Sequence, residues 1–270
     1  SERDAVMKIA IIGTGAMGSV YAGVLAEAGH EIWAIDSWAD HIEQIKSNGL
    51  TVEGASGNRT ITNLSATTDA DDAAACDLYV IATKAEGVGA AAKAVARNMR
   101  EDSLILTIQN GLGAGERIAK FIDTKNVLLG VAEGFGASLK APGHAHHNAM
   151  RQIRIGEMNG GMSERLQSLV AVWKEAGFNA NGFADIHQLI WEKYICNVFL
   201  SAPCAVFDCT IGELVSNPDW REIALGCMRE AYQAGKAKGI NFSFEDADDY
   251  ALKFAAVMPD ASPSLRLDHV

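Results

Sequence analysis

The chain has 270 residues, of which 49% are hydrophobic and 21% are charged. This composition excludes long disordered, collagen-like and low-complexity architectures, and the length allows one large domain or two ordinary ones. The formal net charge of −11 disfavours sequence-independent binding to nucleic-acid phosphates. We therefore expect a globular protein with a substantial core and no nucleic-acid partner, in which an anionic ligand needs local cations.

The cysteines and the longest uncharged run bear on where the protein works. The five cysteines are widely spaced and form no CxxC pair, so the sequence predicts reduced thiols in a cytoplasmic protein rather than a disulfide framework or a zinc ribbon. Residues 9–26 carry no charge and imitate a membrane span in length. Glycines interrupt this run, and no positively charged segment precedes it. We predict a buried strand, a turn and a helix there, and no membrane segment.

The first part of the chain alternates buried strands with helices. Continuous apolar runs predict strands at 8–12, 31–35, 77–83, 103–108 and 127–131, with helices at 16–28 and 38–48 and an alanine-rich helical stretch between 83 and 103. Strands that alternate with helices imply right-handed crossovers. The predicted fold class is therefore α/β, with a Rossmann-like, doubly wound and mainly parallel sheet.

The pattern changes in the second part of the chain. Segment 139–157 surrounds a Pro-Gly pair and is predicted to form a hairpin added to the sheet. From Asp185 onward the apolar spacing is helical, and Pro218 is typical of the first turn of a further helix. We therefore predict a nucleotide-binding α/β domain at 1–184 and an all-helical domain at 185–270.

A glycine-rich motif lies between the first predicted strand and the first predicted helix. In this context GxGxxG has a mechanism: the first glycine allows a tight turn, the second lets a pyrophosphate approach the backbone, and the third permits close helix–strand packing. The free N–H groups at the helix start then face the phosphates. The alternative is a glycine-rich turn in another α/β fold. The expected cofactor-binding residues are Gly13, Thr14, Gly15, Ala16, Met17 and Gly18.

Asp36 ends the second predicted strand, close to the spacing of about 20 residues at which a carboxylate binds the adenosine ribose. A carboxylate there accepts hydrogen bonds from both ribose hydroxyls and repels a 2′-phosphate. No Arg or Lys follows before Lys46 to hold such a phosphate. This favours NAD(H) over NADP(H), which is not excluded, and the alternative is an ordinary turn aspartate.

A polar stripe interrupts the apolar helix predicted at 189–207. Lys193, Asn197 and Ser201 recur every four residues, which places them along one face. Burying an unpaired lysine is costly, so this face must meet water, a partner or a ligand. A lysine in such a place can act as a general acid. The alternative is a lysine whose stem packs at a domain boundary while its ammonium reaches water.

Two further polar residues follow predicted strands. Asn110 comes after the strand at 103–108, at the carboxyl edge where ligands of open α/β sheets lie, and Lys84 ends the strand at 77–83 on the same edge. The alternatives are a turn asparagine and a solvated lysine. His144, His146 and His147 suggest a metal cluster, but strand alternation points His146 and His147 to opposite faces, and no carboxylate or cysteine lies nearby to complete a set. We expect no metal.

Taken together, these motifs resemble the ketopantoate reductase (2-dehydropantoate 2-reductase) family from Met7 to the last residue. The resemblance is carried, in order, by Met7-Lys-Ile, Gly13-x-Gly15-x-x-Gly18, Lys84-Ala, Gln109-Asn110-Gly111, Trp191-Glu-Lys193-x-x-x-Asn197 and Ser262-Pro-Ser264-x-x-x-Asp268. It implies reduction of a 2-keto acid by a nicotinamide cofactor in a cleft between a Rossmann-like and a helical domain. It also implies roles for individual residues: Lys193 as proton donor, Asn197 and Asn110 as substrate contacts, Ser264 near the substrate hydroxyl and Lys84 as a phosphate contact.

Three departures from this family keep alternatives open. The family usually binds NADPH and often has a basic residue where Asp36-Ser37 stands, and Ser201 replaces a second asparagine of the substrate wall. The family also continues for several tens of residues past Val270 and has a glutamate shortly after the Ser264 segment, so we expect the chain to be incomplete at its C-terminus.

The closest alternative, favoured by Asp36 and Ser201, is an NADH-dependent D-2-hydroxyacid dehydrogenase on the same scaffold, acting on branched or aromatic 2-keto acids. A 3-hydroxyacid dehydrogenase is a further alternative, although that family typically has a glycine where Leu189 stands. A nucleotide sensor without turnover is more distant, because it needs no buried proton donor. The helical domain would also allow a homodimer.

Overall fold

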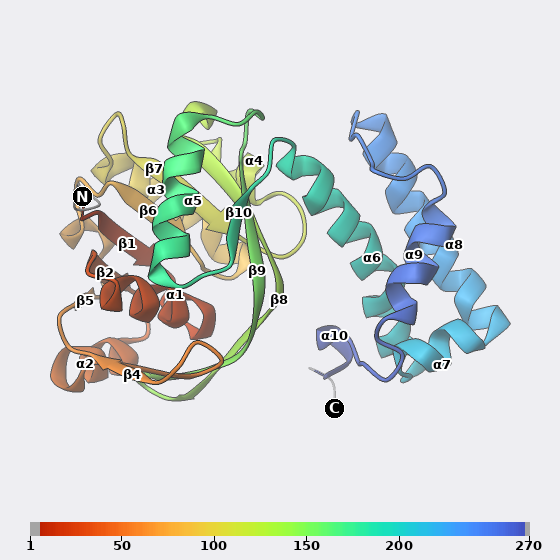
Figure 1. Ribbon diagram of the computed structural model, residues 1–270, viewed down its shortest axis with the longest axis horizontal. Helices are drawn as coiled ribbons and strands as arrows, with labels where there is room; N and C mark the ends of the chain where they lie inside the picture. The colour runs from red at the N-terminus through yellow and green to blue at the C-terminus, as the bar shows by residue number, and fades with distance from the viewer. Residues whose placement is uncertain (1–5, 268–270) are drawn as a thin grey trace. The chain divides into compact units, whose positions relative to one another are not determined.

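The computed structural model describes residues 6–267, and a division after Ile186 separates a sheet-based unit from a helical one (Figure 1). The ten strands of the sheet are β1 (Lys8–Ile12), β2 (Glu31–Ile35), β3 (Leu50–Gly54), β4 (Arg59–Ile61), β5 (Ser65–Thr67), β6 (Leu78–Ile81), β7 (Leu104–Ile108), β8 (Val127–Ala141), β9 (His144–Glu157) and β10 (Ala180–Gly182). Its helices are α1 (Ala16–Glu27), α2 (Ala39–Asn48), α3 (Val88–Asn98), α4 (Ala114–Ile118) and α5 (Glu164–Ala176), with short 3-10 turns η1 (Ala70–Asp72), η2 (Ala85–Gly87) and η3 (Thr124–Asn126).

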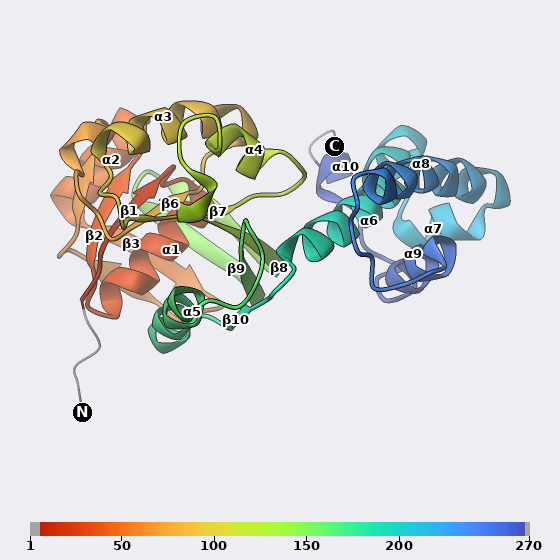
Figure 2. The ribbon, with the colours of Figure 1, turned by 90° about the horizontal axis from the view of Figure 1, so that it is seen from above.

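The parallel part of the sheet has the strand order β5-β2-β1-β6-β7-β8. Numbered along the chain, this is the 3-2-1-4-5-6 order of the doubly wound fold. The direction of winding reverses at β1, which pairs with β2 on one side and β6 on the other. In the view from above, α1 and α5 cover one face of this sheet and α3 and α4 the opposite face (Figure 2). The predicted Rossmann-like fold is confirmed.

The β8–β9 hairpin is much longer than the predicted segment 139–157. β8 pairs with β7 as a parallel strand at its start and continues for 15 residues, with β9 antiparallel beside it. The prediction divided β8 in two because its apolar run stops at Val131, where the strand leaves the core sheet. β9 then pairs in parallel with β3, and the sheet curls back on itself.

Helix α1 lies within this curled sheet and contacts strands from both of its ends, including β2, β3, β8 and β9. Every residue from Gly18 to Ala26 is buried. At Gly23 the approach is so close that an added Cβ would lie 2.7 Å from Val52 Cγ2. This enclosure explains the uncharged run of the sequence, which forms β1, a turn and α1 as predicted. Within residues 6–267, no helix is long and apolar enough to cross a membrane.

The helical unit consists of α6 (Ile186–Phe207), α7 (Ile211–Ser216), α8 (Pro218–Ala237), α9 (Ala247–Ala256) and the short α10 (Ser264–Leu267). Its core packs apolar side chains of α6, α7, α8 and α9 together. Pro218 opens α8 as predicted, with the Asn217 side chain accepting hydrogen bonds from the backbone N–H groups of Asp219 and Trp220. All five cysteines are free thiols and four are buried. Burial, with a smaller contribution from the charge of Glu192, raises the pKa of Cys196 to about 12.

Candidate functional site

The glycine-rich turn lies at the point where the winding of the sheet reverses. Gly13 follows β1 with a φ of +89°, and an added Cβ would lie 2.6 Å from the backbone nitrogen of Thr83, which follows β6. The Gly13 N–H donates to the carbonyl oxygen of Ile35, the last residue of β2, at 2.9 Å. The ends of β1, β2 and β6 therefore meet at this turn, which is where open α/β sheets bind their ligands.

Helix α1 begins at this turn, and no side chain accepts a hydrogen bond from its first backbone N–H groups. Gly15 is the N-cap residue, no side chain caps the helix, and its first turn holds no acidic residue. No atom lies within 4 Å of the position that a Cβ on Gly15 would occupy, whereas a Cβ on Gly18 would lie 2.0 Å from the Gly13 oxygen. The open side at Gly15, the uncapped dipole and the tight packing at Gly18 fit the pyrophosphate of a dinucleotide.

The three residues between these glycines differ in accessibility. Ala16 and Met17 are half-buried at the start of α1, but Thr14 is fully buried. The Thr14 hydroxyl donates inward to the carbonyl oxygen of Ile11 at 3.0 Å. Its side chain therefore holds the turn to the sheet, and any contact of Thr14 with a cofactor would come from its backbone.

Asp36 comes directly after β2 and is half-buried. Its Oδ1 accepts a hydrogen bond from the Trp38 backbone N–H at 2.9 Å, and its own N–H donates to the Thr67 carbonyl oxygen. One carboxylate oxygen is thus committed to the turn that starts α2, which fixes the orientation of the group. This combines the two interpretations of Asp36, because a turn aspartate held in this way can still present its second oxygen to a ribose.

A hydrogen bond joins the ends of β6 and β7. Gln109 Nε2 donates to the Thr83 carbonyl oxygen at 2.6 Å, and the Thr83 hydroxyl is buried with no hydrogen-bond partner. Lys84 and Asn110, the next residues on each segment, are both exposed. Gln109 therefore fixes the spacing between the two candidate ligand contacts. Sequence analysis gave it no role of its own, although it stands beside Asn110 in the same motif.

The polar stripe predicted in the helical unit lies on α6. Burial along this helix repeats every four residues: Lys193, Asn197 and Ser201 are half-buried, while two successive buried residues separate each from the next. The buried residues between Lys193 and Ser201 are Ile195, Cys196, Phe199 and Leu200, all of the helical core. One face of α6 is thus committed to the core, and the other presents an ammonium, an amide and a hydroxyl in a row.

The residues just before Lys193 anchor α6. Glu192 is buried, and its Oε1 accepts a hydrogen bond from the Ser243 backbone N–H at 3.0 Å and another from the Ser243 hydroxyl. Trp191 packs against α8, where a Cβ on Gly235 would lie 2.9 Å from its ring. The Trp191-Glu192 pair therefore fixes the rotation of α6 about its axis, which sets the direction in which Lys193 points. Sequence analysis missed this role of Glu192.

The remaining candidates are Ser264 and the three histidines of β9. Ser264 starts α10, but its side chain and Asp268 lie outside what the structure describes. Within residues 6–267, no cluster of three or more His, Cys, Asp or Glu side chains suits a metal ion. His144 Nε2 lies 3.0 Å from a carboxylate oxygen of Glu53, while His147 is buried and its Nδ1 contacts the Ser56 hydroxyl at 2.9 Å.

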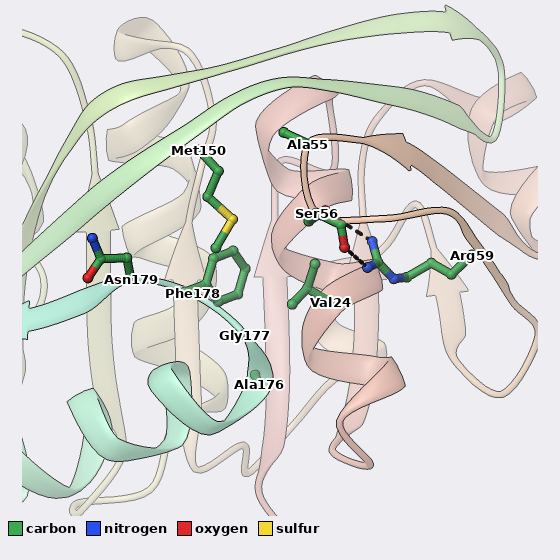
Figure 3. A pocket seen from close by; sticks show the side chains of 9 residues that line it. All are labelled: Val24, Ala55, Ser56, Arg59, Met150, Ala176, Gly177, Phe178 and Asn179. Atoms are coloured by element: carbon green, nitrogen blue, oxygen red, sulfur yellow. Dashed lines mark hydrogen bonds between the residues drawn. The ribbon is translucent and has the colours of Figure 1, made fainter.

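A cavity of about 490 Å³ lies elsewhere in the sheet-based unit (Figure 3). Its lining comes from the later half of α1, the β3–β4 turn, β9 and the end of α5. The one charged side chain among its lining residues is Arg59, which donates to Ser56 and pairs with Glu27 at 2.5 Å. Its charge is therefore already compensated, and none of the candidate cofactor or substrate residues lines this cavity.

These features define a Rossmann-type α/β protein with a helical second unit. The chain belongs to the ketopantoate reductase family of oxidoreductases: residues 9–160 match the family described as ketopantoate reductase PanE/ApbA, and residues 185–270 match its C-terminal region.

Individual relatives extend this likeness along almost the whole chain. A 2-dehydropantoate 2-reductase of Streptococcus pyogenes serotype M3 is 28% identical over 264 residues, which cover 98% of this chain and 85% of the relative. A PanE/ApbA family ketopantoate reductase from Ralstonia eutropha JMP134 has a TM-score of 0.85 at 26% identity, covering 97% of this chain and 85% of that one.

The fold is also shared with D-mandelate dehydrogenase, solved with NADH and anilino(oxo)acetate. The TM-score is 0.83 at 24% identity, with 96% of this chain and 84% of that chain covered.

Proposed function

We propose that the protein reduces a 2-keto acid to a 2-hydroxy acid with a nicotinamide cofactor, and that its substrate is 2-dehydropantoate or a close analogue. Membership of the ketopantoate reductase family supports the class of reaction. The observation that carries the proposal is the polar face of α6, where Lys193 and Asn197 stand four residues apart, half-buried, while the side chains between them belong to the apolar core. A helix needs no such row for packing alone.

In this proposal each unit has its own task. The glycine-rich turn and the N-terminus of α1 hold the pyrophosphate, Asp36 binds the adenosine ribose, and Lys84 meets a phosphate. When bound, the reduced nicotinamide supplies the hydride. Asn110 and Asn197 bind the carboxylate and carbonyl groups of the substrate and fix their orientation.

Lys193 supplies the proton. As the carbonyl carbon is reduced, negative charge develops on its oxygen, and Lys193 Nζ donates a proton to that oxygen to give the hydroxyl. The amine left behind regains its proton from solvent. Ser201, one turn beyond Asn197, lines the part of the substrate site that determines which side chain of the keto acid is accepted.

Free thiols are consistent with a reducing compartment such as the cytoplasm.

We propose NADH as the preferred cofactor, because the carboxylate of Asp36 would repel a 2′-phosphate. The same residue favours a second candidate function, an NADH-dependent D-2-hydroxyacid dehydrogenase on branched or aromatic keto acids. The fold shared with D-mandelate dehydrogenase is compatible with this candidate.

The test crosses two cofactors with two classes of substrate. Oxidation of NADH or NADPH is followed by absorbance with 2-dehydropantoate and with a branched or aromatic 2-keto acid. Turnover of 2-dehydropantoate supports the first function, and NADH-dependent turnover of the bulkier acid alone supports the second. A protein that binds a dinucleotide but turns over neither class contradicts both and favours a nucleotide sensor.

A further inference from the structure

A buried histidine connects the glycine-rich turn to a distant part of the sheet. His41 lies on α2 and is 0% exposed. Its Nδ1 accepts a hydrogen bond from the Gly143 backbone N–H at 2.8 Å, and its Nε2 lies 2.7 Å from the Thr14 carbonyl oxygen. Because Nδ1 acts as an acceptor, the ring is neutral and carries its proton on Nε2, which donates to Thr14.

The partner at Nδ1 is the tip of the β8–β9 hairpin. Gly143 has a φ of +72°, and an added Cβ would lie 3.0 Å from Gln44 Cγ of α2. Its carbonyl oxygen accepts a hydrogen bond from the Thr51 N–H of β3 at 2.9 Å. The hairpin tip is therefore fixed between α2 and β3, and it holds the His41 ring from the side away from the turn.

The partner at Nε2 determines how one peptide of the turn is oriented. The Thr14 carbonyl also accepts a hydrogen bond from the Ser19 hydroxyl at 3.2 Å, so two buried donors hold it inward. In a planar trans peptide the C=O and the following N–H point in opposite directions. An inward Thr14 carbonyl therefore turns the Gly15 N–H outward, at the uncapped start of α1.

We propose that His41 is a positioning residue for the dinucleotide, which holds the Thr14–Gly15 peptide so that the Gly15 N–H points to the pyrophosphate. This inference rests on the proposed function, because it assumes a dinucleotide at the turn. Burial lowers the pKa of His41, and this outweighs the opposite effects of the Thr14 carbonyl and the Asp36 charge. The neutral ring that the geometry requires is thus also the form favoured near neutral pH.

Two substitutions separate the bonds of His41. His41→Gln places an amide oxygen and an amide N–H about as far apart as the ring nitrogens, so both bonds can be kept. His41→Asn is shorter and keeps an acceptor for Gly143 without reaching Thr14. The matched control is His30→Asn, because His30 Nδ1 likewise accepts a backbone N–H, that of Met7 at 3.1 Å.

The measurements combine NMR of the ligand-free protein with NADH binding. We expect the wild-type His41 ring to be protonated on Nε2. The Gly15 amide signal should move in His41→Asn and stay near its wild-type position in His41→Gln. The dissociation constant for NADH should rise about tenfold or more in His41→Asn, the effect of one lost hydrogen bond to a charged group. It should stay within about threefold in His41→Gln and His30→Asn, and the KM for the keto acid should not change.

Different outcomes separate this inference from the proposed function. A wild-type protein that binds neither NADH nor NADPH removes the proposed function and the inference with it. Wild-type binding together with an unchanged NADH affinity and Gly15 signal in His41→Asn overturns the positioning role alone. If His41→Asn fails to fold, the wild-type ring decides: a proton found on Nδ1 overturns the inference.

Discussion

Replacing Gly15 by alanine should separate cofactor binding from folding. Gly15 has a φ of −75° and a ψ of −149°, just beyond the β region, and nothing lies within 4 Å of the added Cβ. Gly15→Ala should therefore leave the free energy of unfolding within about 1 kcal/mol of wild type, because the small backbone strain opposes the gain from a less flexible unfolded chain. The new methyl group would, however, occupy the side from which a pyrophosphate approaches the backbone.

The loss of affinity can be estimated from the bonds at risk. A methyl group that keeps the phosphate from the first N–H groups of α1 removes at least one hydrogen bond to a charged group. Such a bond contributes about 1.5–3 kcal/mol, which corresponds to a roughly tenfold to hundredfold weaker NADH affinity. Denaturant unfolding gives the stability, and quenching or enhancement of fluorescence on NADH titration gives the dissociation constant.

Two other glycines provide the controls. Gly89 lies in α3 and also has nothing within 4 Å of its Cβ position, so Gly89→Ala should raise the free energy of unfolding by up to about 1 kcal/mol and leave NADH affinity unchanged. At Gly18 the Cβ would lie 2.0 Å from the Gly13 oxygen, and Gly18→Ala should destabilise the fold by about 1–3 kcal/mol and weaken binding with it. Wild-type NADH affinity in Gly15→Ala would refute the placement of the pyrophosphate at this turn.

Two further changes test other parts of the proposal. Asp36→Asn keeps the acceptor for the Trp38 N–H and removes the charge, so the ratio of kcat/KM for NADPH to that for NADH should rise about tenfold; an unchanged ratio contradicts ribose recognition by Asp36. Lys193→Met should lower kcat about 10²- to 10⁴-fold with unchanged NADH affinity, and retained turnover excludes it as proton donor.

Burial would raise the pKa of Glu157, but hydrogen bonds from Arg165 and Ser163 hold it below the usual 4.5. Below that pH the unfolded chain binds more protons than the folded protein does. The contribution of ionised Glu157 to the free energy of unfolding is therefore complete above about pH 4.5 and is lost below it as Glu157 is protonated. Glu157→Gln should weaken the fall in the free energy of unfolding below about pH 4.5, measured by denaturant unfolding at several pH values. An unchanged pH dependence contradicts the assignment to Glu157.

Sequence patterns located the buried central strands of the sheet better than they located its edges. Buried strands such as β1 and β6 are continuous apolar runs with glycines or polar residues at their ends, so their position along the chain follows from local composition. β4 and β5 have only three residues each and lie at or near the sheet edges, which is too short for a periodic signal. Their strand conformation depends on partners supplied by the rest of the sheet.

Helix α5 shows a signal that sequence analysis did not use. Ser163 precedes it and accepts a hydrogen bond from the Leu166 N–H, and Gly177 ends it with a φ of +117°. A capping serine and a terminal glycine at helical spacing are readable without a structure. The positioning role of Glu192 is different, because a buried carboxylate cannot be recognised until its partner, Ser243, is known.

The sequence by itself determined the doubly wound fold, the glycine-rich turn with Asp36 beyond it, and the row of Lys193, Asn197 and Ser201 on one helix. Each of these follows from spacing along a short stretch of chain, because strand and helix periods fix which residues share a face. Only the tertiary structure decided that the β8–β9 hairpin curls back to α2 and that His41 joins its tip to the turn, across 102 residues. Such a contact depends on how far a strand extends and how a sheet twists, and these properties arise from the packing of the whole unit rather than from any local pattern.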